Sequence, residues 1–170
     1  MEINEIESYV SKIQDFPKPG ILFYDISTLL SNADAFKSSI DLLKQVASKF
    51  DFDLIGGIDA RGFIFSSALS YSLNCPQLMI RKKNKLPGKT FSIEYDLEYG
   101  KDTLEININV NKKKDLLIDD LLATGGTVNA AANLLKKSGA EICCFISLIE
   151  LTFLKGREKL NFPYQTLIKY

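Results

Sequence analysis

The stretch LLIDDLLATGGTVNAAANLL, residues 116–135, contains the pattern that best indicates the fold class. It begins with an apolar run of the kind that forms a buried strand, and this run leads to the paired acids Asp119 and Asp120. A short segment with Gly125 and Gly126 follows, and then an alanine-rich stretch of high helix propensity. A strand, a glycine-containing turn and a helix in this order form the repeating unit of α/β proteins, so the stretch predicts that class.

The same alternation continues along the rest of the chain. Apolar residues recur at helical spacing from Ile3 to Ile13, which predicts an opening amphipathic helix that ends before the prolines of FPKPG. The segment ILFYDIS predicts a short extended piece, and Asp34 is a candidate N-cap for a second helix. Further on we expect helices at 63–73 and 127–139, a helical turn at 154–160, and strands at 53–57, 76–82, 115–118, 141–151 and 164–170.

Two further segments, 90–96 and 103–110, alternate apolar and polar residues, which is typical of half-buried antiparallel strands. They enclose DLEYGKD, a candidate exposed flap. The whole pattern predicts an α/β fold with a doubly wound, mostly parallel sheet flanked by helices, plus an antiparallel flap hairpin. We expect one domain over residues 1–170 with a flexible lid at about 82–105. Ligands of such folds bind beyond the carboxyl ends of the strands, where IDARG and IDDLLATGGT both lie.

Composition and charge exclude several classes of protein. Lys plus Arg and Asp plus Glu number 21 each, so no overall field attracts nucleic acid or an acidic membrane. The absence of histidine excludes Ser-His-Asp and Cys-His catalysis and every His-ligated metal site. We interpret the three cysteines as small buried hydrophobes, with a metal or redox role as the alternative. With no signal peptide and no apolar stretch of bilayer length, we expect a cytoplasmic protein.

The segment ATGGT, residues 123–127, has the features of a phosphate site. Its two glycines let the backbone curl so that successive N–H groups converge, and its two threonines add hydroxyl donors. The helix that follows favours negative charge at its N-terminus. Walker A and GxGxxG patterns are both absent, so the site suits one terminal phosphate. The alternative is a glycine-rich turn that only joins strand to helix.

Asp119 and Asp120 indicate what else the ligand carries. A carboxylate accepts hydrogen bonds, and the vicinal hydroxyls of ribose donate them. Two acids one short loop before a phosphate site therefore match a sugar phosphate, with its phosphate on the amides and its diol on the acids. The two acids are also candidate ligands of Mg²⁺, directly or through water. The alternative is a solvated turn in which one aspartate caps a backbone N–H.

At this point the chain resembles a known family. The run LLIDDLLATGGT resembles the phosphoribosyl-pyrophosphate motif of type I phosphoribosyltransferases, and its form is most similar to that of the adenine-specific members. Similar motifs follow one another in family order along nearly the whole chain: FPKPGILFYDIS, GIDARGF, IRKKNKLPG, LEYGKDTLEI and LIELTFLKGREKL. The resemblance implies a type I phosphoribosyltransferase-like fold with one phosphoribosyltransferase domain. It also implies transfer of the 5-phosphoribosyl group from phosphoribosyl pyrophosphate to N9 of adenine, giving AMP and pyrophosphate in purine salvage.

The resemblance also assigns roles to residues around the phosphoribosyl group. The implied 5′-phosphate ligands are Ala123, Thr124, Gly125, Gly126 and Thr127, while Asp119 and Asp120 bind the ribose hydroxyls and Mg²⁺, the latter directly or through water. The implied pyrophosphate ligands are Asp59, Ala60, Arg61, Gly62, Arg81, Lys82 and Lys85. Family members often carry a non-proline cis peptide in the loop that corresponds to residues 59–62. Because the arginine that corresponds to Arg81 often reaches across from a neighbouring subunit, we expect a homodimer. From the charge balance and the lack of a bilayer-length apolar stretch, we expect that it binds neither nucleic acid nor membrane. The alternatives are a surface arginine at position 61 and a solvated basic turn.

The remaining implied roles concern the base. Glu98 and Tyr99, in the lid, correspond to the catalytic group that meets the N7/N9 edge of the purine, although they could instead only shape a hairpin turn. Adenine binding is implied for Leu22, Phe23, Tyr24 and Asp25. Many relatives have arginine where this chain has Tyr24, so a charged contact is in doubt there, and Asp25 has a local turn cap as its alternative role.

Two other functions remain open at this stage. One is a transferase for hypoxanthine, guanine or xanthine, which uses the same chemistry on another base. The other is a non-catalytic regulator that senses phosphoribosyl pyrophosphate and binds nucleic acid. The neutral charge balance, the lack of an appended DNA-binding segment and the EYG lid argue against the regulator.

Overall fold

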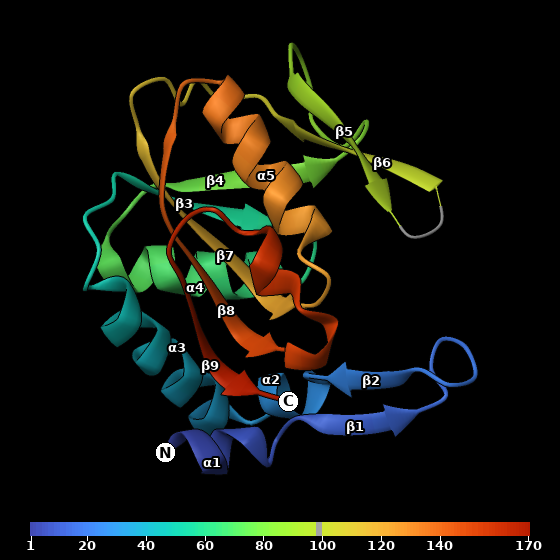
Figure 1. Ribbon diagram of the computed structural model, residues 1–170. Helices are drawn as coiled ribbons and strands as arrows, with labels where there is room; N and C mark the ends of the chain where they lie inside the picture. The colour runs from blue at the N-terminus through green and yellow to red at the C-terminus, as the bar shows by residue number, and fades with distance from the viewer. Residues whose placement is uncertain (98–99) are drawn as a thin grey trace. The chain divides into compact units, whose positions relative to one another are not determined.

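The computed structural model describes residues 1–97 and 100–170 (Figure 1). Contacts between residues divide the chain into two compact units, Met1–Leu42 and Leu43–Tyr170. The expectation of one domain over residues 1–170 stays a prediction. Within the described residues, no helix combines the length and the apolar character needed to cross a bilayer.

The first unit contains short elements. They are α1 (Ile3–Glu7), β1 (Ser11–Gln14), β2 (Leu22–Asp25) and α2 (Ser27–Ser31), and α3 (Ala33–Ala47) continues into the second unit. The opening helix therefore ends at Glu7, and the expectation that it reaches Ile13 is wrong. Residues 11–14 pair antiparallel with β2 instead, and Ile13 is exposed there. Cross-strand hydrogen bonding outweighs the helical spacing of the apolar residues, which is a weak local preference.

The start of α3 also differs from expectation. The side-chain oxygen of Asn32 accepts a hydrogen bond from the Ala35 N–H at 2.9 Å, so Asn32, and not Asp34, caps the helix. Asp34 lies in the first turn, where its charge is favourable near the helix N-terminus. The expected cap was thus wrong by two residues, while the expected helix is present.

The second unit is built on a seven-stranded sheet (Figure 1). Its strands are β3 (Leu54–Ile58), β4 (Gln77–Lys82), β5 (Phe91–Leu97), β6 (Gly100–Ile106), β7 (Lys114–Leu122), β8 (Glu141–Glu150) and β9 (Tyr164–Lys169). Their spatial order is β5-β6-β4-β3-β7-β8-β9. The five strands from β4 to β9 in this order run parallel, and the β5–β6 hairpin joins β4 antiparallel. The expected mostly parallel sheet with an antiparallel hairpin is confirmed.

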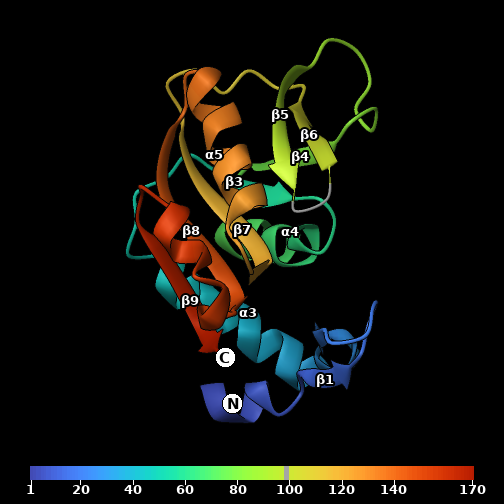
Figure 2. The same ribbon diagram turned by 45° about the vertical axis from the view of Figure 1, so that its right-hand side comes forward.

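Two helices cover opposite faces of this sheet (Figures 1 and 2). Helix α4 (Gly62–Leu73) joins β3 to β4, and α5 (Gly126–Lys137) joins β7 to β8. The two connections leave the sheet centre in opposite directions, so right-handed crossovers place the helices on different faces. The core under α5 includes Leu117, Leu134 and Phe145. On the other face, a side chain at Gly57 would overlap Ser66 of α4, so glycine permits close packing there.

Strand β7 is longer than the sequence pattern predicts. It runs through Asp119 and Asp120, so the expectation that these acids lie in the loop after a strand ending at residue 118 is wrong. As a central strand, β7 keeps its pairing with β8 as far as Leu122↔Glu150, and this pairing holds the acids in extended backbone. Successive side chains of a strand point to opposite faces, so the two acids face different sides of the sheet.

The remaining elements follow expectation more closely. The 3₁₀ turns η1 (Thr152–Leu154) and η2 (Gly156–Lys159) form the expected helical turn, whereas the second flap strand ends at Ile106 and not at residue 110. All three cysteines are free thiols. The expectation that all of them are buried is confirmed for Cys144 and wrong for Cys75 and Cys143, which are half-buried. Burial raises the pKa of Cys144 to about 12, as it raises that of Cys143 to about 11, so both thiols stay protonated and inert at neutral pH.

Candidate active site

The candidate site lies where the order of the parallel strands reverses. Strand β3 leads to α4 on one side of this point and β7 leads to α5 on the other, so the loops at their carboxyl ends are neighbours. In sheets of this type the ligand binds in the crevice outside such a reversal. The loops are residues 59–62, which contain a cis Asp59–Ala60 peptide, and residues 123–127. The structure thus brings together the two predicted loops.

The second loop encloses a small cavity of about 80 Å³. Its lining residues are Asp119, Leu121, Ala123, Thr124, Gly125, Gly126, Thr127 and Val128. Gly125 has φ +76°, a left-handed conformation that favours glycine, and its carbonyl accepts from the Asn129 N–H at 3.0 Å. The amides just before Asn129 belong to the first helical turn and have no acceptor inside the helix. These groups and the helix dipole make the cavity suitable for one phosphate group.

Asp119 and Asp120 occupy different surroundings although they are adjacent. Asp119 is half-buried, lines the cavity, and its Oδ1 accepts from the Asp120 N–H at 2.9 Å. Asp120 is 4% exposed, and its Oδ2 lies 2.8 Å from a guanidinium nitrogen of Arg61, with which it forms an ion pair. The first acid is therefore the one that faces a ligand in the cavity, and the second holds the arginine of the neighbouring loop.

Burial shifts the titration of both acids. It raises the pKa of Asp119 well above its usual value, and the nearby Asp120 carboxylate raises it further. Burial also raises the pKa of Asp120, against the opposing effect of Arg61. An anionic pair in such a place is costly unless donors or a cation compensate it. Ribose hydroxyls or a divalent cation would supply that compensation.

Gly62 lets the first loop approach the acids. A Cβ at this position would lie 2.9 Å from both the Asp119 Oδ1 and the Ile118 carbonyl oxygen, closer than such contacts normally occur. Its absence allows α4 to begin directly against β7. The glycine of GIDARGF thus has a steric role that fits its place in the predicted loop.

The basic side chains of the site are held by acids. Arg81 Nε lies 3.1 Å from Asp59 Oδ2, and its guanidinium stands 5.7 Å from the centre of the Phe63 ring. The same Asp59 oxygen accepts from the Lys82 N–H at 3.3 Å. The Lys82 amine forms an ion pair with Asp102 of β6. Asp59 therefore orients Arg81 at the end of β4, and Asp102 ties Lys82 to the flap hairpin.

Sequence reasoning missed Asp102, since its partner lies on a strand that pairs with β6 only in the folded sheet. It also missed Gly156, whose backbone packs against the loop of residues 123–127. The glycine of LKGREKL was a signal for it, because an isolated glycine often marks a close approach of two backbones. Lys85 is exposed, and its carbonyl oxygen lies 3.4 Å from an Arg81 nitrogen.

The predicted adenine segment forms β2 in the first unit. Phe23 packs edge-on against Phe16 with ring centres 5.0 Å apart, and Tyr24 is buried. The Asp25 carboxylate accepts from the Ser27 N–H at 3.0 Å and from the Ser27 hydroxyl at 2.7 Å, so its alternative role as a turn cap is confirmed. The predicted catalytic residues Glu98 and Tyr99 lie outside the described residues.

The side chains available as ligands determine how the site could bind a metal ion. In residues 1–97 and 100–170, no three acidic or cysteine side chains gather as metal ligands. Mg²⁺ normally combines one or two carboxylates with water and substrate phosphate oxygens. Asp119, with a carboxylate on the cavity, fits that pattern, provided that the bound substrate supplies other oxygen ligands.

Known proteins are similar to this chain in sequence and in fold. The profile of the family described as "Phosphoribosyl transferase domain" matches residues 25–166. The adenine phosphoribosyltransferase of Acidiphilium cryptum is 46% identical over 167 residues, which are 97% of this chain and 98% of that protein. The crystal structure of adenine phosphoribosyltransferase from Thermoanaerobacter pseudethanolicus is 44% identical, with a TM-score of 0.95 over 99% of each chain. The enzyme of Saccharomyces cerevisiae, solved with an imino-altritol bisphosphate and adenine, is 35% identical, with a TM-score of 0.91 over 97% of each chain.

Proposed function

This chain belongs to the phosphoribosyl transferase domain family, and on that premise we propose the reaction that it catalyses. It is a pentosyltransferase that moves the 5-phosphoribosyl group of phosphoribosyl pyrophosphate to N9 of adenine, giving AMP and pyrophosphate. One observation carries the proposal: a cavity for a single phosphate shares its wall with the Asp119 carboxylate. A ligand with a phosphate at one end and hydroxyls at the other matches that wall.

We assign the phosphoribosyl group to this cavity. The amides and hydroxyls of residues 123–127 bind the 5′-phosphate, and Asp119 accepts hydrogen bonds from the ribose hydroxyls. Asp120 takes part in hydroxyl binding once Arg61 turns from it towards pyrophosphate oxygens. An ion pair of 2.8 Å joins these two side chains.

Pyrophosphate binding falls to the loop of residues 59–62 and to the basic side chains at the end of β4. The N-terminus of α4 and the Arg61 guanidinium favour anionic oxygens. Asp59 supports this role indirectly, because it fixes Arg81 and does not itself attract an anion. Lys82 and Lys85 contribute positive charge beside the same loop.

In the reaction, N9 of adenine forms a bond to C1 of the ribose while the bond from C1 to the pyrophosphate oxygen breaks. Positive charge develops on the ribose ring, and a base takes the proton that the purine releases. We assign that proton to the lid residue Glu98, with Tyr99 beside it. The protein holds both reactants in line and excludes water.

Base choice is assigned to residues 22–25. Adenine offers an acceptor at N1 and donors at N6, whereas hypoxanthine presents the opposite pattern. Backbone groups of an extended segment discriminate between these patterns, because the wrong base leaves buried polar groups without partners. Leu22 is partly exposed and apolar, which suits the face of a purine ring.

Three further proposals accompany the reaction. Mg²⁺, held by Asp119 and substrate oxygens, would neutralise charge on the departing pyrophosphate. A homodimer would share its sites through Arg81. The reaction would serve purine salvage in the cytoplasm.

The test is the release of pyrophosphate and AMP from phosphoribosyl pyrophosphate in the presence of Mg²⁺, with adenine or hypoxanthine as the acceptor. We expect turnover with adenine and a much lower kcat/KM with hypoxanthine. Preference for hypoxanthine or guanine would identify another purine transferase. No turnover with any purine, together with binding of phosphoribosyl pyrophosphate, would instead support a sensing regulator.

A further inference from the structure

Gly156, at the start of η2, touches the phosphate loop (residues 123–127) through backbone atoms. A Cβ at Gly156 would overlap the carbonyl oxygen of Ala123 and would lie 2.9 Å from the amide nitrogen of Gly125. Conversely, a Cβ at Gly125 would overlap the carbonyl oxygen of Gly156. The two segments therefore meet glycine to glycine, and neither position has room for a side chain.

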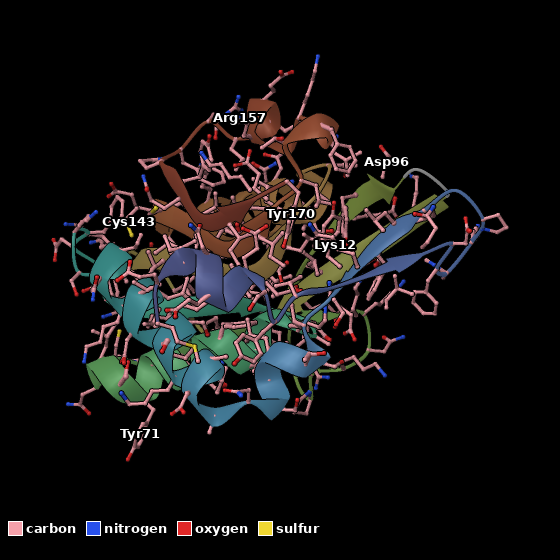
Figure 3. All side chains as sticks on the ribbon, turned by 90° about the horizontal axis from the view of Figure 1, so that it is seen from below. Lys12, Tyr71, Asp96, Cys143, Arg157 and Tyr170 are labelled. Atoms are coloured by element: carbon pink, nitrogen blue, oxygen red, sulfur yellow. The ribbon has the colours of Figure 1, made fainter. Side chains whose placement is uncertain are left out.

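The need for glycine at these two positions has different causes. Gly125 has φ +76°, so its backbone conformation alone favours glycine. Gly156 has no such left-handed conformation, and a side chain is excluded there only by the closeness of the loop. Gly156 is also buried while Lys155 and Arg157 on either side are exposed, and Arg157 lies on the surface (Figure 3). A side chain introduced at position 156 would therefore act on the protein through its contact with the phosphate loop.

The segment that carries Gly156 is fixed from both sides. On one side, the Leu151 N–H donates to the Leu122 carbonyl at 2.9 Å, which continues the pairing of β8 with β7. Thr152 donates to the backbone oxygen of Tyr170 twice, from its N–H at 2.8 Å and from its hydroxyl at 2.6 Å. On the other side, η2 packs against α5, the helix that begins at the loop. Because the segment that carries Gly156 is held on both sides and contacts the phosphate loop, it limits the backbone conformations that the loop can adopt.

We propose that Gly156 is a positioning residue that sets the curvature of the phosphate loop and so its affinity for the 5′-phosphate. The amides of this loop bind a phosphate only when they converge on one point, and the loop has no bulky side chain to hold it in that shape. The backbone of Gly156 fills that role from outside. This inference rests on the proposed function, since it takes the loop as the site of the 5′-phosphate.

The experiment compares wild-type protein with the variant Gly156→Ala. Isothermal titration with ribose 5-phosphate gives the Kd, and steady-state kinetics give KM for phosphoribosyl pyrophosphate and for adenine separately. The added methyl pushes Ala123 and Gly125 outward, so we expect the Kd for ribose 5-phosphate and KM for phosphoribosyl pyrophosphate to rise about tenfold or more, the effect of losing one charge-assisted hydrogen bond. KM for adenine should stay unchanged.

The matched control is Gly139→Ala. This glycine lies at the opposite end of the sheet, has φ +88°, and a Cβ there would overlap the side chain of Asn111. It should lower the melting temperature as Gly156→Ala does, yet leave the Kd for ribose 5-phosphate unchanged. Equal losses of affinity in both variants would show that affinity follows stability, which would overturn the proposal. Wild-type affinity in a folded Gly156→Ala protein would also overturn it.

A second variant covers the case in which Gly156→Ala does not fold. Thr152→Val removes the hydroxyl that donates to Tyr170 and adds no volume near the loop. We expect a smaller increase in the Kd for ribose 5-phosphate, about two- to fivefold for the loss of one hydrogen bond outside the loop. An unchanged Kd there, with Gly156→Ala unfolded, counts against the proposal. Wild-type protein that binds ribose 5-phosphate without forming AMP would refute the proposed function and leave this positioning role standing.

Discussion

Strand β7 carries acidic residues near both of its ends, and the partners of their carboxyl groups differ between the two ends. At its amino end, Asp115 is fully buried; its Oδ1 accepts from the Gly56 N–H at 3.1 Å, and its Oδ2 has no hydrogen-bond partner among the described residues. At its carboxyl end, Asp119 lines a cavity and Asp120 pairs with Arg61. All three acids have a raised pKa, with burial as the main cause.

The difference lies in what surrounds the carboxylates and not in the acids themselves. The carboxyl end has a cation, a helix N-terminus and an open cavity within reach, so a ligand or Arg61 compensates the buried charge. At the amino end, Asp115 accepts a hydrogen bond from one backbone amide. Most of the free-energy cost of ionising its buried carboxyl group is therefore not compensated and lowers the stability of the fold. A perturbed pKa therefore marks a candidate site only when a pocket and a partner accompany it.

The largest effect is expected from the double change Asp119→Asn with Asp120→Asn. An amide accepts a hydroxyl hydrogen bond less strongly than a carboxylate does, and two such bonds are affected. We expect kcat/KM for phosphoribosyl pyrophosphate to fall about 100-fold or more, with the fold intact by circular dichroism. The control Asp115→Asn, on the same strand, should keep wild-type kcat/KM. If kcat/KM falls equally in the double variant and in Asp115→Asn, the acids at the carboxyl end of β7 have no special role in binding the substrate.

Removal of the cation at the carboxyl end should destabilise the fold. Arg61→Ala leaves the Asp120 carboxylate buried without its partner, at a cost of about 1–3 kcal/mol, because the arginine side chain is itself a third exposed. Chemical denaturation at pH 8 measures this cost. Adding Asp120→Asn to Arg61→Ala should recover most of it. If Arg61→Ala alone has wild-type stability, the ion pair does not compensate the buried charge.

The amino end predicts a dependence of stability on pH. Burial raises the pKa of Asp115 to about 7 in the folded protein, against 3.8 as its ordinary value, so the folded state keeps a proton that the unfolded state has lost. Its contribution to stability is complete below pH 4 and is lost as the pH rises to about 7, with a slope of up to about 1.4 kcal/mol per pH unit.

Asp115→Asn removes this dependence. Denaturation at pH 4, 5, 6, 7 and 8 should show the variant close to wild type at pH 4 and increasingly more stable than wild type as the pH rises towards 7, with little further gain at pH 8. A constant difference between the two proteins over this range would mean that Asp115 does not titrate with a raised pKa.

Local sequence patterns predicted the parts of the fold that depend on local preference. The glycine pair, the helix after it and the alternating flap strands follow from conformational freedom, helix propensity and period-two alternation. The extension of β7 through Asp119 and Asp120 depends on pairing with β8, which lies more than 20 residues further along the chain. The opening helix was overestimated for a similar reason, because β2 takes up residues 11–14.

The candidate site also has features that the sequence predicts and features that depend on contacts between distant segments. The two loops were predictable, because each places glycines and polar residues after a buried strand. The pairings of Arg61 with Asp120, of Arg81 with Asp59 and of Lys82 with Asp102 depend on which strands are neighbours. So does the contact of Gly156 with the phosphate loop. The three ion pairs between distant segments carry no local signal in a single sequence, whereas the isolated glycine at position 156 was a signal for a close backbone contact.

We expect Asp119 to bind the hydroxyls of a ligand whose phosphate lies on residues 123–127. Titration of wild type and Asp119→Asn with ribose 5-phosphate and with 2-deoxyribose 5-phosphate tests this role, since the two ligands differ by one hydroxyl. We predict that wild type binds ribose 5-phosphate about tenfold more tightly than the deoxy ligand, and that Asp119→Asn loses most of this preference. If Asp119→Asn discriminates between the two ligands as well as wild type does, Asp119 does not bind the hydroxyls.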